Sequence, residues 1–409
     1  MKKPEILAPA GDFTCLQAAL DAGADAVYFG LGTFNMRARS GVNFKTEDLP
    51  EIAARCGRVK RYLTLNAIMF EGETDEVERT IVAAKPYVDA FIVADWGVIS
   101  LCRKHGATFH VSTQMSTSNS TAVSFLVSQG ASRVVLAREC TLAEVAEIVR
   151  KTGVEIECFV HGAQCVAESG RCFMSHDVFG KSACRGECNQ PCRRRFLVKA
   201  VDLYQDAEGN PVHEAKTAFE VEPHTVLSAR DLCSLGFIDR LMAAGIASFK
   251  IEGRARNANY VKTVVTAYRR AVDAVADGTY TRELVVSLTE DVKRVFHREF
   301  AEGLYFGRPG AHQFADSEDS LATTVKRHVG IVVDYFLKAG IVQVKIQDHA
   351  IRPGDPIQVH GPTTGVVELI VGELRRDDET PSVGEKGTWV TFKCPRCRVG
   401  DKVFFAESR

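Results

Sequence analysis

The sequence predicts an α/β fold: a (β/α)8 barrel of the TIM type with a long cysteine-rich insert after its seventh strand, followed by a small C-terminal antiparallel β-barrel. Three observations predict it: eight short apolar runs, amphipathic segments between the early runs, and a change of pattern near the C-terminus. Strands separated by helices pair in parallel, because each crossover must carry the chain back across the sheet. A doubly wound open sheet is the alternative, but Ala10-Gly11-Asp12 is too short for the glycine fingerprint that such a sheet would carry.

The apolar runs and the helical segments alternate over the first two thirds of the chain. The predicted strands occupy residues 6–8, 26–30, 62–68, 90–94, 108–112, 133–137, 155–161 and 248–252. Apolar residues recur at helical spacing in residues 13–22, 75–85, 122–129 and 142–151, and again in residues 259–277 and 288–296. Eight strand–helix units in a stretch of this length suit a closed barrel.

Two regions depart from this alternation. The segment 162–247 is far longer than an ordinary βα loop and has strand-like pieces at 196–203 and 217–221, which is typical of a functional insert or lid. Short strands separated by turn residues occupy 330–334, 341–346, 356–359, 364–371, 389–392 and 401–405. We therefore predict a barrel domain at residues 1–320, including the insert and the trailing helices, and a C-terminal β-barrel domain at residues 321–409.

Composition is that of a soluble globular protein, with 45% hydrophobic and 25% charged residues and a formal net charge of −1. No segment approaches the roughly 20 apolar residues that a membrane helix needs. The N-terminal segment MKKPEILAPAGDF lacks the apolar run of a secretory signal, so a cytoplasmic location and reduced thiols are expected. The charge excludes a strongly basic nucleic-acid binder but allows a local basic patch, and Arg193-Arg194-Arg195 fits a solvated face more simply.

Cysteines are crowded in the seventh predicted strand and in the segment that follows it. Six of the 13 cysteines lie there: Cys158, Cys165, Cys172, Cys184, Cys188 and Cys192. A disulfide framework would require an oxidising compartment. Structural zinc usually draws on closely spaced cysteine pairs, and Cys165 and Cys172 are spaced more widely. Iron–sulfur clusters accept thiolates from separate loops, so the spacing favours a cluster while leaving zinc or unligated thiols open.

Polar residues stand at the C-terminal ends of the predicted strands, where barrel enzymes place their chemistry. The candidates are Arg37, Asn66, Gln114, Arg138, Glu139, His161, Glu252 and Arg254. Arg37, Arg138 and Arg254 would together supply guanidinium groups suited to carboxylate or phosphate. Glu139 and Glu252 would orient these arginines or act as general bases. Because the cysteine-rich segment opens at the end of the seventh strand, we expect a metal site over the barrel mouth.

Three further cysteines stand apart from that segment. Cys233 follows Ser228-Ala229-Arg230-Asp231-Leu232 at a predicted helix start, where the helix dipole would favour a thiolate, and it is a candidate distant ligand. Cys394 and Cys397 resemble half of a zinc site. No second pair follows them, so a pair in a strand or turn is the simpler interpretation.

Eight phrases of the sequence resemble a known family. They are EILAPAGDFTCLQAALDAGADAVYFG, FNMRA, HVSTQMSTSN, VVLAREC, FVHGAQCVAESGRCFMS, CNQPCR, SARDLC and SFKIEGR. In this order they resemble the collagenase-like peptidases of family U32, over nearly the whole chain. The family includes proteins that hydroxylate tRNA uridine at the wobble position or a ribosomal RNA cytidine, and oxygen-independent ubiquinone hydroxylation factors. The resemblance implies a 4Fe-4S cluster on four cysteines and, for the RNA branch, prephenate as the source of the hydroxyl group.

The resemblance also implies which cysteines bind the cluster. When the ligand positions of the family motifs are carried over to the matching phrases of this sequence, the implied ligands are Cys165, Cys172, Cys188 and Cys233. Cys192 also belongs to the usual family pattern and is the main substitute for Cys188. Cys158, inside a predicted strand, and Cys184, where many relatives have another residue, are expected to be bystanders.

The predicted function is oxygen-independent hydroxylation of tRNA uridine to 5-hydroxyuridine, with the arginines holding prephenate, a small dicarboxylate. The resemblance implies that the C-terminal barrel, similar to one in translation elongation factors, docks tRNA. Alternatives are hydroxylation of ribosomal RNA or of a ubiquinone precursor, a U32 peptidase, and a non-enzymatic iron–sulfur partner protein. The motifs GxSxG and HExxH are absent, and a cysteine nucleophile would compete with cluster ligation. A mere partner protein needs no converging arginines.

Overall fold

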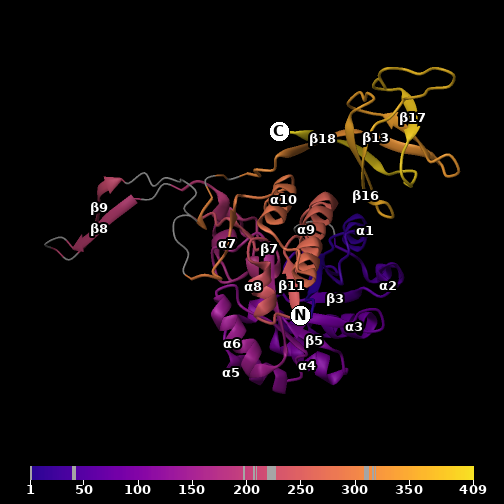
Figure 1. Ribbon diagram of the computed structural model, residues 1–409. Helices are drawn as coiled ribbons and strands as arrows, with labels where there is room; N and C mark the ends of the chain where they lie inside the picture. Colours follow the sequence, from indigo (N-terminus) through magenta and orange to yellow (C-terminus); the bar gives the residue numbers. More distant parts are fainter. Residues whose placement is uncertain are drawn as a thin grey trace.

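A closed ring of eight parallel strands forms the centre of the protein (Figure 1). The computed structural model describes residues 2–38, 43–196, 199–205, 208, 210–218, 227–307, 313–315, 317 and 319–409. The ring consists of β1 (Glu5–Pro9), β2 (Ala26–Gly30), β3 (Lys60–Leu65), β4 (Ala90–Val93), β5 (Phe109–Val111), β6 (Arg133–Val135), β7 (Glu155–Gly162) and β11 (Ser248–Ile251). Strand β11 closes it by pairing in parallel with both β1 and β7. The predicted TIM-type barrel is confirmed, and the open-sheet alternative is wrong.

The barrel strands are buried on both faces, which explains why they are nearly continuous apolar runs in the sequence. All of β2 is buried, and in β7 only Glu155 is exposed. Each predicted strand is present, although β3 ends at Leu65 rather than at residue 68. The chain leaves the barrel there because the amide of Ala67 bonds to Phe34 O and that of Ile68 to Cys184 O, in loops above the barrel.

Helices cover the outside of the ring. They are α1 (Phe13–Asp21), α2 (Leu49–Cys56), α3 (Thr74–Ala84), α4 (Trp96–Lys104), α5 (Ser120–Ser128), α6 (Leu142–Thr152), α8 (Ile238–Ala243), α9 (Ala258–Asp277) and α10 (Arg282–Lys293). Two polar strand-end residues serve as helix caps: Asp12 accepts from Cys15 N at 2.7 Å and Asp95 from Gly97 N at 2.8 Å. None of the helices in the described residues combines the length and apolar composition that crossing a membrane requires.

The insert after β7 contains α7 (Met174–Phe179) and an antiparallel pair, β8 (Lys199–Gln205) with β9 (Pro211–Ala218). Strand β8 matches the predicted piece 196–203, whereas most of the piece 217–221 lies outside the described residues. The prediction of a helix start at Cys233 is wrong. Residues Asp231–Cys233 form strand β10, because β6 ends beside Glu157 and leaves that edge of β7 open at His161 and Gly162 for antiparallel pairing. Strand β12 (Phe300–Ala301) then pairs with β10.

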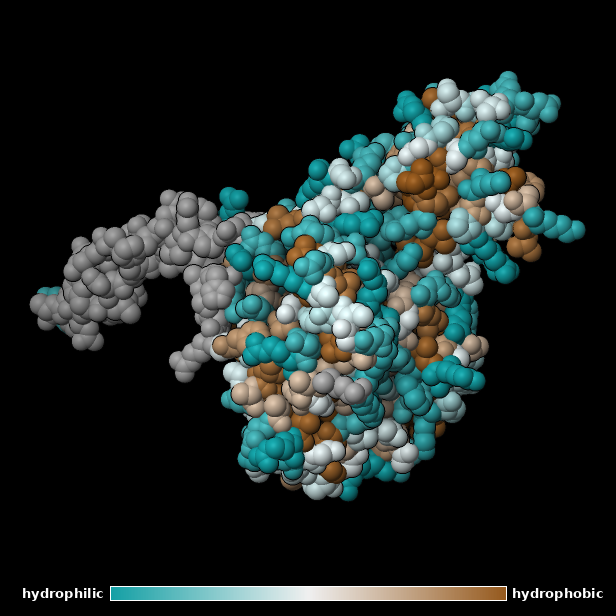
Figure 2. All heavy atoms as spheres, viewed as in Figure 1, coloured by the Kyte–Doolittle hydropathy of each residue, from teal (hydrophilic) through white to brown (hydrophobic). Residues whose placement is uncertain are grey.

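The C-terminal region forms a six-stranded antiparallel sheet around its own core, as predicted. Its strands, in sheet order, are β16 (Gly365–Ile370), β15 (Pro356–Gly361), β18 (Lys402–Ser408), β13 (Thr324–Phe336), β14 (Ile341–Ile346) and β17 (Trp389–Lys393). It rests on α1 and α9 through β16, where Lys262 Nζ donates to Val366 O at 2.8 Å (Figure 1). Cys394 and Cys397 are buried in this core. On the face drawn in Figure 2, apolar residues occur in groups separated by polar ones. The domain division after residue 320 remains a proposal.

Candidate active site

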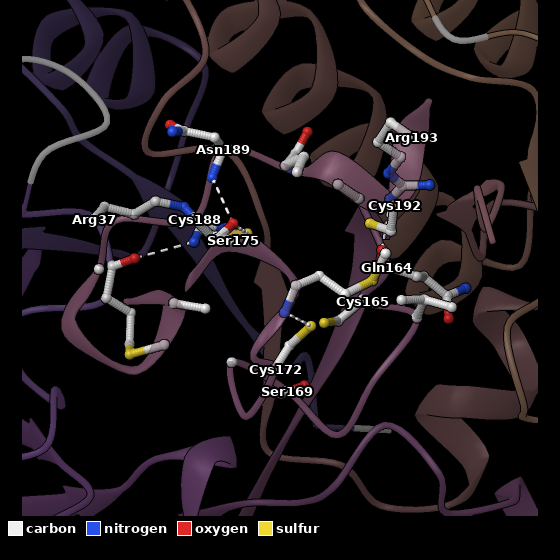
Figure 3. A pocket seen from close by; sticks show the side chains of 18 of the residues that line it. Arg37, Gln164, Cys165, Ser169, Cys172, Ser175, Cys188, Asn189, Cys192 and Arg193 are labelled. Atoms are coloured by element: carbon white, nitrogen blue, oxygen red, sulfur yellow. Dashed lines mark hydrogen bonds between the residues drawn. The ribbon is translucent and has the colours of Figure 1, made fainter. Parts of the chain in front are cut away.

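Two adjoining cavities lie at the C-terminal ends of the barrel strands. The larger, about 290 Å³, is lined on its outer side by the insert, with Cys165, Cys172, Cys188 and Cys192 in its wall (Figure 3). The smaller, about 70 Å³, lies in the barrel mouth. Both cavities are lined by Met36, Arg37, Gln114, Arg138 and Glu252. The cysteines and the strand-end arginines therefore face one continuous region, as the position of the cysteine-rich segment predicted.

The sulfur atoms of the large cavity are held by local hydrogen bonds. The amide of Met174 donates to Cys172 Sγ at 3.4 Å, and Ser175 Oγ lies 3.8 Å from Cys188 Sγ. Burial raises the pKa of the Cys192 thiol, with the charges of the three other cysteines adding to it and Arg193 opposing it. These four thiols are thus electrostatic neighbours. In the part of the chain that the structure describes, no three His, Cys, Asp or Glu side chains converge tightly enough to hold a single metal ion.

Two residues fasten the insert over the barrel. Gly186 has φ 79°, and a Cβ there would lie 2.3 Å from the carbonyl oxygen of Asn35, so only glycine allows this close approach. The buried Arg193 donates to Gln164 O at 2.5 Å, to Ser228 Oγ at 3.3 Å and to Ala229 O. No carboxylate of the described residues pairs with it. A buried guanidinium therefore stands beside the cysteines, with neutral oxygens as its hydrogen-bond acceptors and the charge of Asp231 nearby.

Three arginines, Arg37, Arg138 and Arg254, line the cavity at the barrel mouth. Arg37 Nη2 lies 2.9 Å from Glu252 Oε1. Arg254 donates to Thr64 Oγ1 at 2.8 Å and to Asn35 Oδ1 at 2.6 Å, so neutral groups hold this buried guanidinium.

Burial and neighbouring charges shift the pKa values of the ionisable groups at the barrel mouth. Burial lowers the pKa of Arg254 to about 10 and also lowers that of Arg138, whose guanidinium stacks 3.9 Å from the centre of the Phe159 ring. Burial opposes ionisation of Glu252, but Arg37, Arg256 and Arg138 outweigh it and lower the pKa of this carboxyl. The mouth is therefore a desolvated site with more cations than anions.

A buried ion network lies at the base of the small cavity. Lys250, which lines this cavity, donates to Glu157 Oε1 at 2.8 Å and stands 4.7 Å from the centre of the Tyr28 ring. Arg133 lies 3.3 Å from the other oxygen of Glu157 and also pairs with Glu5 at 2.6 Å. Burial lowers the pKa of Lys250, against the opposing effect of Glu157. Lys250 was not among the predicted site residues, although a lysine inside a strand that is buried on both faces is a signal.

The structure separates the other predicted residues into two groups. Asn66 donates to Ser112 Oγ at 3.1 Å and to Gln114 Oε1 at 3.0 Å, so this predicted pair lies together at the mouth. Glu139 is exposed and lines neither cavity. His161 lies behind the mouth, its Nδ1 3.3 Å from Tyr268 Oη, and burial lowers its pKa to about 3. Neither Glu139 nor His161 is therefore placed to touch a ligand in these cavities.

The remaining cysteines lie elsewhere. Cys233 lines neither cavity; its sulfur is 3.9 Å from Tyr268 Oη, and burial raises its pKa to about 11 rather than favouring a thiolate. Cys184 Sγ is 3.3 Å from Gly170 O, and Cys158 is buried within β7. Two further residues of the large cavity, Arg193 and Arg256, were not predicted as site residues, because only the fold brings them to the cysteines. The prediction of a solvated face is wrong for Arg193, which is buried, whereas Arg194 and Arg195 are exposed.

Comparison with known proteins shows to which family the chain belongs. The family model for Peptidase family U32 matches residues 11–314. A protein of Porphyromonas gingivalis named collagenase is 37% identical over 99% of this chain and 98% of its own length. The tRNA hydroxylation protein P1 of Bacillus subtilis is 35% identical over 88% of this chain and 84% of its own length. The solved structure of the U32 peptidase Mk0906 covers 62% of this chain and 95% of its own, at 14% identity and a TM-score of 0.39. The chain therefore belongs to peptidase family U32.

Proposed function

We propose that this protein is an iron–sulfur-dependent RNA hydroxylase that converts tRNA uridine at the wobble position to 5-hydroxyuridine, with prephenate as the source of the hydroxyl group. One observation carries the proposal: four cysteines share a cavity that adjoins an arginine-lined cavity at the barrel mouth. The similarity to the tRNA hydroxylation protein P1 of Bacillus subtilis supports RNA as the substrate.

The donor set fits a 4Fe-4S cluster. Four thiols from the insert line one cavity, and each iron of a cluster takes its own thiolate, so the ligands need no common meeting point. Cys165, Cys172 and Cys188 are the ligands on which the family resemblance and the cavity agree. The fourth is Cys192 by its place in the cavity wall, or Cys233 by the resemblance. When bound, the cluster would supply one-electron chemistry beside the barrel mouth.

The barrel mouth fits a small dicarboxylate such as prephenate. Arg254 is buried and Arg138 is half-buried with its Nε enclosed and unbonded, and neither forms an ion pair with a carboxylate of the described residues, so each retains a desolvation cost. A ligand with two carboxylates would relieve both costs, and a guanidinium fork binds carboxylate through two parallel hydrogen bonds. Glu252 orients Arg37 toward the same space through the ion pair described above. Lys250 adds a further cation at the base of the cavity.

Two measurements test the proposal. Protein purified without oxygen should contain iron and sulfide and should absorb broadly at roughly 400 nm. Replacing Cys165 or Cys188 with alanine should abolish this absorbance, whereas Cys184→Ala, a neighbouring thiol outside the cavity wall, should retain it. Of Cys192→Ala and Cys233→Ala, the one that loses iron identifies the fourth ligand. Iron-free wild-type protein would refute the cluster.

The RNA substrate is tested by mass spectrometry of tRNA nucleosides from a strain that lacks the gene. Loss of 5-hydroxyuridine and its derivatives, restored by the wild-type gene and not by the Cys165→Ala variant, is expected. Unchanged tRNA together with a missing hydroxycytidine in ribosomal RNA, or with a hydroxylation defect in ubiquinone, would move the protein to another branch of its family.

Peptidase activity is the second candidate, because a relative that matches nearly the whole chain is named collagenase. The Cys165 and His161 pair does not support it. His161 lies behind the cavity against Tyr268 and does not line the wall in which Cys165 stands. Incubation of the iron-loaded protein with denatured collagen should therefore release no peptides, and cleavage lost in the Cys165→Ala variant would favour the peptidase.

A further inference from the structure

Helix α7 and the residue before it carry apolar side chains that are largely or half exposed. Phe173, at the N-terminal end of α7, is 82% exposed, and Val178 is 48% exposed. The opposite side of the same segment faces the large cavity through Cys172, Met174 and Ser175. The exposed ring of Phe173 is thus one residue from the cavity cysteine Cys172. Phenylalanine side chains are usually buried, so this exposure is unusual.

Guanidinium groups accompany these rings. Arg171 is exposed and donates to Gln114 O at 2.7 Å, with no carboxylate partner among the described residues. Arg194, also exposed, stacks 4.8 Å from the centre of the Phe179 ring. Residues 163–196 contain six arginines and lysines against three acidic residues, in a chain whose net charge is −1. The insert is therefore a local basic surface on a nearly neutral protein.

A second aromatic and guanidinium pair extends this surface to the loop after β3. Phe70 is 59% exposed, and the Arg185 guanidinium lies 4.8 Å from the centre of its ring. The insert reaches this loop directly, because Ile68 N donates to Cys184 O at 3.4 Å and Arg185 pairs with Glu73 at 2.9 Å. Aromatic rings and guanidinium groups thus alternate around the cysteine cavity.

We propose that this rim, consisting of Phe70, Arg171, Phe173, Phe179, Arg185 and Arg194, binds a single-stranded segment of RNA. This inference rests on the proposed function and adds the surface that presents the substrate. Bases stack on the exposed rings of Phe173 and Phe70, and Arg171 and Arg194 contact phosphates. A base between these contacts then enters the cavity, which costs little in an unpaired loop.

The chemistry of the rim favours RNA over a protein partner. The centres of protein interfaces are depleted in charged residues and apolar over a continuous area. Here Phe70 and Phe179 each have an arginine over the ring, and the exposed Arg171 is two residues from Phe173, which matches the alternation of bases and phosphates along a nucleic acid strand. The rings accept any base by stacking, so the rim supplies affinity, and sequence preference falls to the cavity.

Binding of a fluorescein-labelled anticodon stem-loop RNA to the full-length, anaerobically purified protein tests the rim by fluorescence anisotropy. Phe173→Ala should weaken binding about tenfold, and Phe173→Trp should restore it. Phe125→Ala is the matched control, because Phe125 is 54% exposed on α5, outside the rim. Arg171→Gln should weaken binding and lower the slope of log affinity against log salt by about 0.7, the value for one lost contact to single-stranded nucleic acid.

Iron content, measured on every variant, separates this inference from the proposed function. Weakened RNA binding by Phe173→Ala with iron retained supports the rim, even if the tRNA nucleosides of the deletion strain are the same as those of the wild-type strain. Wild-type affinity in Phe173→Ala overturns the rim, whether or not tRNA hydroxylation is confirmed. Equal binding of a fully paired RNA duplex, or loss of binding in Phe125→Ala as well, also overturns it.

Discussion

Replacing Glu157 with glutamine tests the ion network beneath the small cavity. The Glu157 side chain is fully buried, with Lys250 at 2.8 Å and Arg133 at 3.3 Å. Arg133 would still pair with Glu5 and Glu155, but Lys250 would lose its only carboxylate partner among the described residues. Breaking a buried pair in this way costs about 3–5 kcal/mol of unfolding free energy, because one buried charge is left uncompensated.

The pH dependence of this loss follows from Lys250. Burial already lowers the Lys250 pKa, and loss of Glu157 lowers it further. The unfolded chain then binds more protons than the folded one between that lowered value and about 10.4, so stability rises with pH across this window. The deficit of Glu157→Gln relative to wild type should therefore shrink as the pH is raised from 7 toward about 10.

Urea unfolding followed by circular dichroism measures these differences. The double variant Glu157→Gln, Lys250→Met should recover most of the stability, because both charges are removed together. Glu155→Gln is the control: Glu155 also pairs with Arg133, but its side chain is 50% exposed, so the loss should stay below about 1 kcal/mol. If Glu157→Gln unfolds at the wild-type urea concentration at pH 7, or the double variant is no more stable than the single one, the reasoning is refuted.

Three other predictions concern the core and the site. Burial lowers the pKa of His110 to about 3, so its stabilising contribution is complete above the unfolded value of about 6.5 and is lost as the pH falls; unfolding of His110→Phe should depend less on pH, and an unchanged acid profile would contradict this. Arg254→Lys should raise the dissociation constant for prephenate at least tenfold in calorimetry, because the planar fork is lost; unaltered affinity would remove Arg254 from the ligand site. Arg193→Met should lower the midpoint reduction potential of the cluster, because a buried cation favours the reduced form of the cluster. Arg193→Lys keeps the charge and should leave the potential near the wild-type value. Equal potentials in the wild type and both variants would show that Arg193 only holds the insert in place.

The strand pattern was predictable, because strands buried on both faces are continuous apolar runs that can be read along the chain. The strand ends were therefore predictable as well, and Arg37, Asn66, Gln114, Arg138, Glu252 and Arg254 all line the small cavity. Glu139 does not, although it adjoins Arg138. Both residues lie in the turn after β6, where Arg138 reaches the mouth and donates to Ala163 O at 2.6 Å, whereas Glu139 is exposed to solvent.

The sequence by itself determined the barrel, the position of the cysteine-rich insert over its mouth, and the family, because apolar periodicity and short motifs are local properties of the chain. Only the tertiary structure decided which polar groups meet. It brought Lys250 to the cavity base, turned His161 toward Tyr268, and placed Cys192 in the cavity wall and Cys233 in a strand beside β7. These outcomes depend on contacts between residues that are far apart in sequence, such as the antiparallel pairing of β10 with β7. No local sequence pattern encodes such pairing.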